Sequence, residues 1–130
     1  MSHFCKNITS ENSSYRLTEN TRSVGFIYRH IGETINLIAQ FYGYQTTVEG
    51  TTIGKKDTGT KYDLETSRKY IEDGFETLRK LVEETSDNEW FEEIKTTWFG
   101  TITRFKLFSI LLFHTSHHCG QISMTIVNGK

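Results

Sequence analysis

The sequence predicts an all-α domain in which long amphipathic helices pack as an antiparallel bundle. Three segments repeat apolar residues at three- and four-residue steps, the spacing that lines one face of an α-helix. The chain has no proline, a residue that interrupts helices. Its 130 residues match one ordinary domain, residues 1–130, which can bury a core without disulfides or a structural metal. Any bound metal is therefore expected to serve function rather than architecture.

The first helix is predicted over residues 22–42. Asn20, Thr21 or Ser23 can cap its start, and Gly43 can end it. Its apolar face comprises Val24, Ile27, Tyr28, Ile31, Ile35, Ile38 and Phe41 or Tyr42.

Two further helices are predicted. The second starts at Asp63, a good N-cap, and runs to about Thr85, with Arg, Lys and Glu on its outer face. Its inward positions are Leu64, Ser67, Ile71, Phe75, Leu78 and Val82. The third begins near Thr101 and closes at Asn128-Gly129. Its apolar band is broad enough to predict that this helix is largely buried, and comprises Ile102, Phe105, Phe108, Ile110, Leu112, Phe113, Ile122 and Ile126.

The connecting segments also carry predictions. Residues 1–19 are polar and leave room for a short helix at most. The segment from Gly43 to Tyr62 is rich in Gly and Thr, and a connection of this length is typical of a crossover or a site-lining loop. Residues 86–100 are rich in aromatic side chains and predict a short helix or a packed turn, in which Trp90 and Trp98 seal one end of the bundle. The N-terminal segment or a second subunit would complete the bundle.

Charge and composition exclude several classes of function. Fifteen Lys and Arg residues balance sixteen Asp and Glu residues, and no long run of like charge occurs, so neither nucleic acid nor a membrane surface is expected as a partner. The apolar run from Phe105 to Phe113 is too short to span a bilayer. No secretory signal is recognisable at the N-terminus, so a cytoplasmic location is expected. Cys5 and Cys119 show no CxxC spacing and are expected to be reduced thiols.

Three of the five histidines lie within five residues, in the segment His114-Thr-Ser-His117-His118-Cys119-Gly-Gln121. Residues four apart on a helix have β-carbons about 5–6 Å apart, so His114 and His118 can direct their imidazoles at one ion, whereas His117 is rotated away. His30 lies near the edge of the apolar face of the first helix, where a lone histidine is usually a core residue. Together the two helices can offer three nitrogen ligands and leave a fourth position for water or substrate.

Two segments resemble the DinB-like family. Ser23-Val-Gly-Phe-Ile-Tyr-Arg-His30-Ile-Gly-Glu33 is similar to the helix that carries the family's first histidine ligand. His114-Thr-Ser-His-His118-Cys-Gly-Gln-Ile122 is similar to the signature of its last helix, in which two histidines four apart precede Arg-Gly-Gln. The resemblance runs over about 100 residues, from Arg22 to Ile126, with both motifs in the family's order and separation.

The resemblance implies an antiparallel four-helix bundle, commonly a homodimer, with a divalent metal such as zinc, nickel or iron held by three histidines. Carried over position by position, the implied ligands are His30, His114 and His118. Characterised relatives include transferases that use low-molecular-weight thiols such as bacillithiol, and a mycothiol-dependent isomerase. The family name refers to damage-inducible expression in bacteria and not to DNA binding.

Two departures from the family pattern stand out. Cys119 occupies the position that is usually arginine. Only 29 residues, mostly polar, precede His30, so we expect the N-terminal helix to be a short stub or the bundle to gain packing from a partner.

The favoured functional interpretation is thiol activation, because a coordinated divalent cation lowers the pKa of a thiol and delivers a thiolate to a small-molecule substrate. Gln121 can orient a ligand imidazole or line the rim of the site, and a plain surface role is equally open. A metal-dependent hydrolase is an alternative in which Glu33 serves as the base, although we favour a solvated helix residue at that position. A third possibility is a bundle that binds a metal or small ligand without turnover, which the short N-terminal helix and Cys119 would favour.

Overall fold

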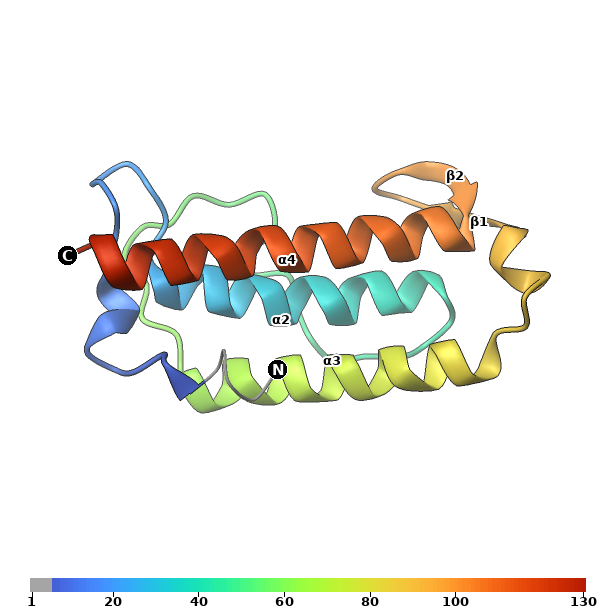
Figure 1. Cartoon of the computed structure of the whole chain (residues 1–130), viewed down its shortest axis with the longest axis horizontal. Helices are drawn as coiled ribbons and strands as arrows, with labels where there is room; N and C mark the ends of the chain where they lie inside the picture. Colours follow the sequence, from blue (N-terminus) through green and yellow to red (C-terminus); the bar gives the residue numbers. More distant parts are fainter. Residues whose placement is uncertain (1–5) are drawn as a thin grey trace.

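The computed structural model describes residues 6–130. Its long helices are α2 (Val24–Phe41), α3 (Leu64–Glu84) and α4 (Arg104–Asn128), and α2 lies between the other two (Figure 1). These bounds match the three predicted helices to within a few residues. Three long helices, not four, are present in the described part of the chain, so the expected four-helix bundle is seen only in part.

The direction of the helices differs from the prediction. α4 runs antiparallel to α2, as expected, but α2 and α3 run in the same direction (Figure 1). The connection between them, residues 42–63, makes this possible because it returns along α2: Thr52 contacts Glu33 near the middle of that helix, and Asp57 accepts from the backbone N–H of Ser23 at its start. The loop is therefore a crossover, one of the two roles that the sequence predicted for it.

Local capping sets where each helix begins. Ser23 Oγ accepts from Phe26 N at 3.2 Å at the start of α2, and Asp63 Oδ2 accepts from Thr66 N at 2.9 Å at the start of α3. Thr103 Oγ1 accepts from Lys106 N at 3.1 Å and begins α4. These side chains satisfy N–H groups that have no partner within the first helical turn.

Two glycines let α2 and α3 approach closely. A β-carbon on Gly32 would lie 2.7 Å from the β-carbon of Tyr70, and one on Gly74 would lie 2.5 Å from Cγ2 of Ile35. Asn36, which is buried, then bridges the pair by donating from Nδ2 to the carbonyl oxygens of Gly32 and Tyr70, each at 2.8 Å. The contact therefore depends on the absence of side chains at two positions.

Residues 86–103 contain a short 3₁₀ helix (Glu89–Phe91) followed by a β-hairpin. The sequence predicted a short helix or a packed turn in this segment. Strands β1 (Glu93–Thr96) and β2 (Gly100–Thr103) pair antiparallel, with Thr96 opposite Gly100. Gly100 has a φ of 68°, which a residue without a β-carbon adopts without strain. Because residues 100–103 form strand β2 and pair with β1, α4 begins at Arg104 and not near Thr101.

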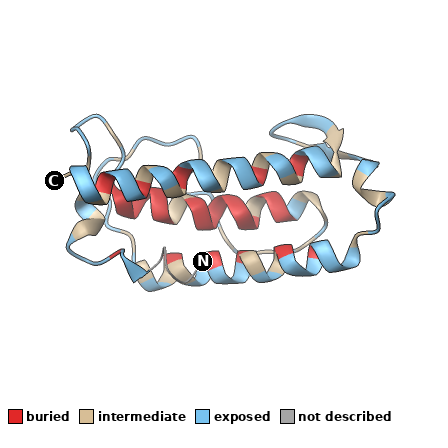
Figure 2. Ribbon diagram, viewed as in Figure 1, coloured by how far each residue is buried: buried red, intermediate tan, exposed pale blue. Residues whose placement is uncertain are grey.

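Burial is concentrated on α2 (Figure 2). α4 buries only Leu107, Leu111, His118, Ile122 and Thr125, so the prediction that it is largely buried is wrong. Its opposite face is exposed and includes Phe105, Leu112, Phe113, Met124 and Val127. On α3, Val82 is exposed where the prediction placed it inward, and Leu81 is buried instead. The physical reason is that α3 and α4 each pack mainly against α2 and on one side only.

The N-terminal segment lies against the end of α4. Within the described residues it contains one 3₁₀ turn (Asn12–Ser14), and the side chain of Ile8 is buried. Arg16 and Lys130 exchange two backbone hydrogen bonds, each of 3.1 Å. Across residues 6–130, none of the helices combines the length and apolar character that crossing a membrane would require.

Candidate metal centre

The structure brings His30, His114 and His118 together at the contact between α2 and α4. His30 Nε2 lies 3.2 Å from His114 Nε2, and His114 Nε2 lies 3.0 Å from His118 Nε2. The three residues can each offer one ligand atom, all within 4.8 Å of one another. Nitrogen atoms bound at 2.0–2.1 Å to one tetrahedral ion would lie about 3.3 Å apart, so the separations of His114 from His30 and from His118 fit a metal site.

The partner of His118 determines which of its ring nitrogens is free. Gln121 Oε1 lies 2.6 Å from His118 Nδ1, and a carboxamide oxygen can only accept. Nδ1 therefore carries the proton, and the lone pair of Nε2 faces the other two histidines. This is the role that outer hydrogen bonds play for metal-binding histidines.

His30 is held in the same tautomer by a longer chain of contacts. Thr52 Oγ1 lies 3.1 Å from His30 Nδ1 and 2.7 Å from Glu33 Oε1. A carboxylate oxygen accepts, so the single hydroxyl proton of Thr52 goes to Glu33 and the hydroxyl oxygen accepts from His30 Nδ1–H. The Nε2 lone pair of His30 is thereby left for the site.

Glu33 is fully buried and not the solvated residue that the sequence favoured. Its carboxylate accepts from Thr52 N at 2.8 Å, from Thr52 Oγ1, and from Thr51 Oγ1 at 2.6 Å. These bonds fasten the loop between α2 and α3 to the middle of α2. Glu33 therefore acts on His30 through Thr52 and does not itself face the three imidazole nitrogens.

His114 differs from the other two histidines. Its Nδ1 is buried and has no hydrogen-bond partner in the described residues. Its Nε2 faces both other Nε2 atoms. With the His114 proton on Nδ1, all three Nε2 lone pairs would be available to one cation, so the donor set fits a metal ion.

Burial keeps the three imidazoles uncharged at neutral pH. It lowers the pKa of His30 to about 3, with further lowering from the neighbouring His118 and His114. It also lowers the pKa of His114 to about 4. Burial lowers the pKa of His118 as well, and the hydrogen bond to Gln121 opposes that shift. Since only neutral imidazole binds a metal, the site is ready to accept one at pH 7.

The neighbouring candidates lie elsewhere. His117 is exposed and stacks on Phe113, with ring centroids 6.1 Å apart. Cys119 is partly buried against the apolar core. His3 and Cys5 lie outside the described residues.

The family model of the DinB superfamily matches residues 1–122. The chain belongs to the DinB superfamily. Among solved structures, a DinB-like protein from Bacillus subtilis matches with a TM-score of 0.65 and 21% sequence identity, covering 95% of this chain and 80% of that one. At this identity the likeness shows the fold alone. A comparison with curated proteins finds no match.

In this DinB chain, sequence reasoning missed Thr51 and Thr52. Neither belongs to a recognisable motif, and Thr52 reaches His30 only because the loop folds back along α2. The available signal was the length of the loop, which predicted that it lines a site.

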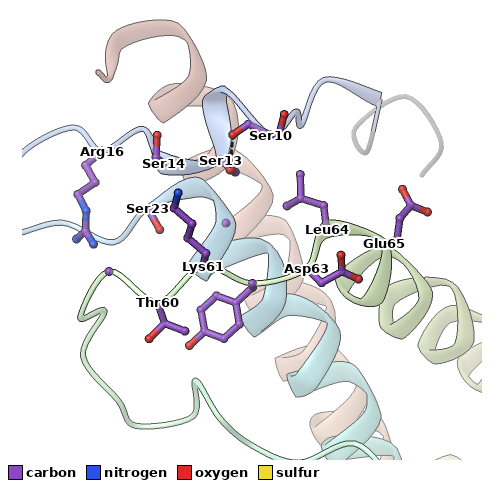
Figure 3. A pocket seen from close by; sticks show the side chains of 13 residues that line it. Ser10, Ser13, Ser14, Arg16, Ser23, Thr60, Lys61, Asp63, Leu64 and Glu65 are labelled. Atoms are coloured by element: carbon purple, nitrogen blue, oxygen red, sulfur yellow. Dashed lines mark hydrogen bonds between the residues drawn. The ribbon is translucent and has the colours of Figure 1, made fainter.

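The structure also has a pocket that the three histidines do not line. It has a volume of about 530 Å³ and lies where the N-terminal segment meets the first residues of α2 and α3 (Figure 3). Its polar lining includes Ser10, Ser13, Ser14 and Lys61. Asp63, at its edge, already caps α3. No residue of this pocket is one of the three histidines or hydrogen-bonds to them.

Proposed function

We propose that this DinB protein binds one divalent transition-metal ion, zinc, nickel or iron, through His30, His114 and His118, and that it is a metal-dependent thiol S-transferase. The observation that carries the proposal is the convergence of three neutral Nε2 atoms, with the protonated Nδ1 of His30 and of His118 turned toward Thr52 and Gln121. Three ligands leave a coordination position open.

A divalent cation at such a site supplies stabilisation of a thiolate at neutral pH, which makes a low-molecular-weight thiol nucleophilic. The chain's own residues orient the ligands and keep them neutral. Gln121 holds one ring from α4, while Glu33 and Thr52 hold the other from α2 and its loop. Because both rings are already held in place, the site would need little side-chain rearrangement to bind a metal ion.

The hydrolase alternative has less support than thiol transfer. Its candidate base, Glu33, already accepts three hydrogen bonds from Thr51 and Thr52. A general base must come within hydrogen-bond reach of the proton that it removes. Glu33 lies behind Thr52 and is better described as a positioning residue for His30.

The first experiment is elemental analysis of tag-free protein after incubation with zinc, nickel or iron. We expect about one equivalent of metal in the wild type and a large loss in His30→Ala and His118→Ala. His117→Ala is the matched control, because His117 is on the same helix but exposed, and it should keep its metal. Equal metal content in all four proteins, or none in the wild type, would overturn the metal site.

Loaded protein is then screened for conjugation of small thiols to varied electrophiles. Thiol conjugation that disappears in His30→Ala would support the transferase. A stable, metal-loaded protein without such activity would instead identify a non-catalytic binding module.

We also propose that a second copy of the chain covers the outer face of α4, making a homodimer. From Leu107 to Gly129 the chain contains no Asp, Glu, Lys or Arg. The exposed part of this stretch includes Leu112, Phe113, Met124 and Val127. Two such faces can meet without opposing like charges, and large exposed apolar patches commonly mark interfaces.

A further inference from the structure

A cavity of about 550 Å³ opens beside the three-histidine site. Its lining comes from the N-terminal segment, from the loop between α2 and α3, and from both helices of the site: Ile27 of α2, and Gln121 and Thr125 of α4. Gln121 is also the residue that accepts the hydrogen bond from His118 Nδ1. The cavity and the metal centre therefore share a wall.

Only two of the charged side chains that line this cavity form an ion pair with each other. Arg16 forms an ion pair of 3.0 Å with Asp57, whose side chain is only 2% exposed, so these two charges cancel. The remaining charged lining residues are Arg22, Lys56 and Glu19. Among residues 6–130, no ion pair joins any of these three to another side chain. The cavity thus keeps a surplus of positive charge.

Arg22 is linked to the histidines through the ring of Phe26. Its guanidinium carbon is 5.4 Å from the centre of the Phe26 ring, and Phe26 in turn stacks on His30 with centroids 6.4 Å apart. A group held by Arg22 would therefore lie next to the aromatic ring that stacks on His30.

The metal centre itself adds to the positive field. Its three ligands are neutral imidazoles, so they would not cancel the charge of a divalent ion. A surplus of positive charge in a cleft concentrates ligands of the opposite sign.

We infer that the substrate of this site is a small molecule with an anionic group, a carboxylate or a phosphate, which Arg22 and Lys56 bind while its reacting end reaches the three-histidine centre. The inference rests on the proposed function, because it assigns a substrate class to the same site. Both cations are exposed in the structure and available to a ligand. An arginine suits a two-oxygen anionic group, since its planar donors match two oxygens at once.

The test is calorimetric titration of the zinc-loaded full chain at pH 7.5 and low salt. The probes are mercaptosuccinate, which has a thiol and two carboxylates, mercaptoethanol, which has only the thiol, succinate, which has only the carboxylates, and inorganic phosphate. The proteins are the wild type, the double variant Arg22→Gln with Lys56→Gln, and a control double variant, Arg79→Gln with Lys69→Gln, on the exposed face of α3. Metal content is measured in each preparation.

We expect the wild type and the control to bind mercaptosuccinate about tenfold more tightly than mercaptoethanol, and the Arg22 and Lys56 double variant to lose that difference. Its metal content and its affinity for mercaptoethanol should not change. Comparing succinate with phosphate then distinguishes a carboxylate from a phosphate site. Equal binding of mercaptosuccinate by all three proteins would overturn the inference.

The failure of the proposed function gives a different result. If neither thiol binds but succinate or phosphate still binds through Arg22 and Lys56, the anionic subsite stands and thiol activation falls. If the wild type binds mercaptoethanol but prefers no anionic probe, thiol binding stands and the subsite falls.

Discussion

Single residues determine how the candidate ligands are held. His118 and His30 each donate a hydrogen bond from Nδ1, to Gln121 on α4 and to Thr52 in the loop between α2 and α3, and each bond leaves Nε2 unprotonated. His114 has no such support among the described residues. The orientation of the site therefore depends on two outer contacts, which can be removed separately.

Replacing Gln121 with Leu should weaken metal binding about 10- to 100-fold, because His118 Nδ1–H loses its acceptor and the ring loses its fixed tautomer. Gln121→Glu keeps an acceptor oxygen and should bind metal more tightly than Gln121→Leu. Competition with a chromophoric chelator measures both affinities. Gln40→Leu, an exposed change on α2, serves as the control. An unchanged affinity in Gln121→Leu would show that this contact does not support the site.

Replacing Thr52 with Val should lower metal affinity about tenfold, since it removes the hydroxyl between His30 and Glu33. Thr51→Val is the matched control, because Thr51 also bonds to Glu33 but does not contact His30. Both variants lose a hydrogen bond to the same carboxylate and should lose about 1–3 kcal/mol of stability at most. Equal metal affinity in the two variants would mean that Thr52 has only a structural role.

At the scale of elements, α2 is the helix on which the other two long helices and the loop between α2 and α3 pack. It lies between α3 and α4, carries His30 and Glu33, and receives the returning loop along its length. Its contact with α3 depends on Gly32 and Gly74, and its start is tied to the loop through Asp57. Changes at these contacts should alter stability without removing any ligand.

Gly32→Ala and Gly74→Ala should each destabilise the fold by about 1–3 kcal/mol, because the new β-carbon would overlap Tyr70 or Ile35. Gly120→Ala is the opposite case: it lies within α4 and its β-carbon would meet nothing within 4 Å. We expect it to stabilise the chain by about 0.5–1 kcal/mol, the usual gain of Ala over Gly in a helix. Urea unfolding at one low protein concentration measures all three, and a stabilised Gly32→Ala would contradict the close approach.

Asp57 should make stability depend on pH. Burial alone would raise the pKa of its carboxyl, but hydrogen bonds from Ser23 and Gly59 together with the charge of Arg16 lower it below 3.8. The ionised form is therefore favoured by folding, and its contribution is present above the unfolded pKa and lost as pH falls through the folded value. The stability difference between the wild type and Asp57→Asn should be largest near neutral pH and should shrink below about pH 4. Thermal unfolding across this range tests it, and a constant difference would refute it.

At the scale of the whole molecule, α4 has two different faces. One face carries two candidate ligands and packs on α2, and the other presents exposed apolar side chains in a stretch without charged residues. A domain that leaves such a face to solvent would be poorly soluble on its own. The homodimer proposed above would cover it.

Phe113→Glu should therefore shift the protein from dimer to monomer, because two carboxylates would be brought into an apolar contact. Val82→Glu, an exposed apolar position on α3, is the control and should leave the oligomeric state unchanged. Sedimentation velocity at several concentrations gives the answer. A monomeric wild type, or a variant that remains dimeric, would rule out this face as the interface.

Much of the fold could be predicted because an α-helix is determined largely by residues that are close together in the sequence. The period of the apolar residues and the capping side chains placed α2 and α3 to within two residues, and the His-x-x-x-His spacing placed His114 and His118 on one face of α4. The hairpin was missed because its four-residue strands are too short to give a period. The exposure of α4 was missed because an apolar band shows what can be buried and not what covers it.

The sequence by itself therefore determined the helices, their caps and the placing of His114 and His118 on one helix face, since these depend on contacts within a few residues along the chain. His30 was added to them by the resemblance to the DinB-like family. Only the tertiary structure decided that α2 and α3 run in the same direction, that Glu33 is buried behind Thr52, and that Arg22 and Lys56 line a cavity beside the histidines. The reason is physical: each of these features joins residues that are distant in the chain, and the path of a loop of more than fifteen residues has no periodic signal to reveal it.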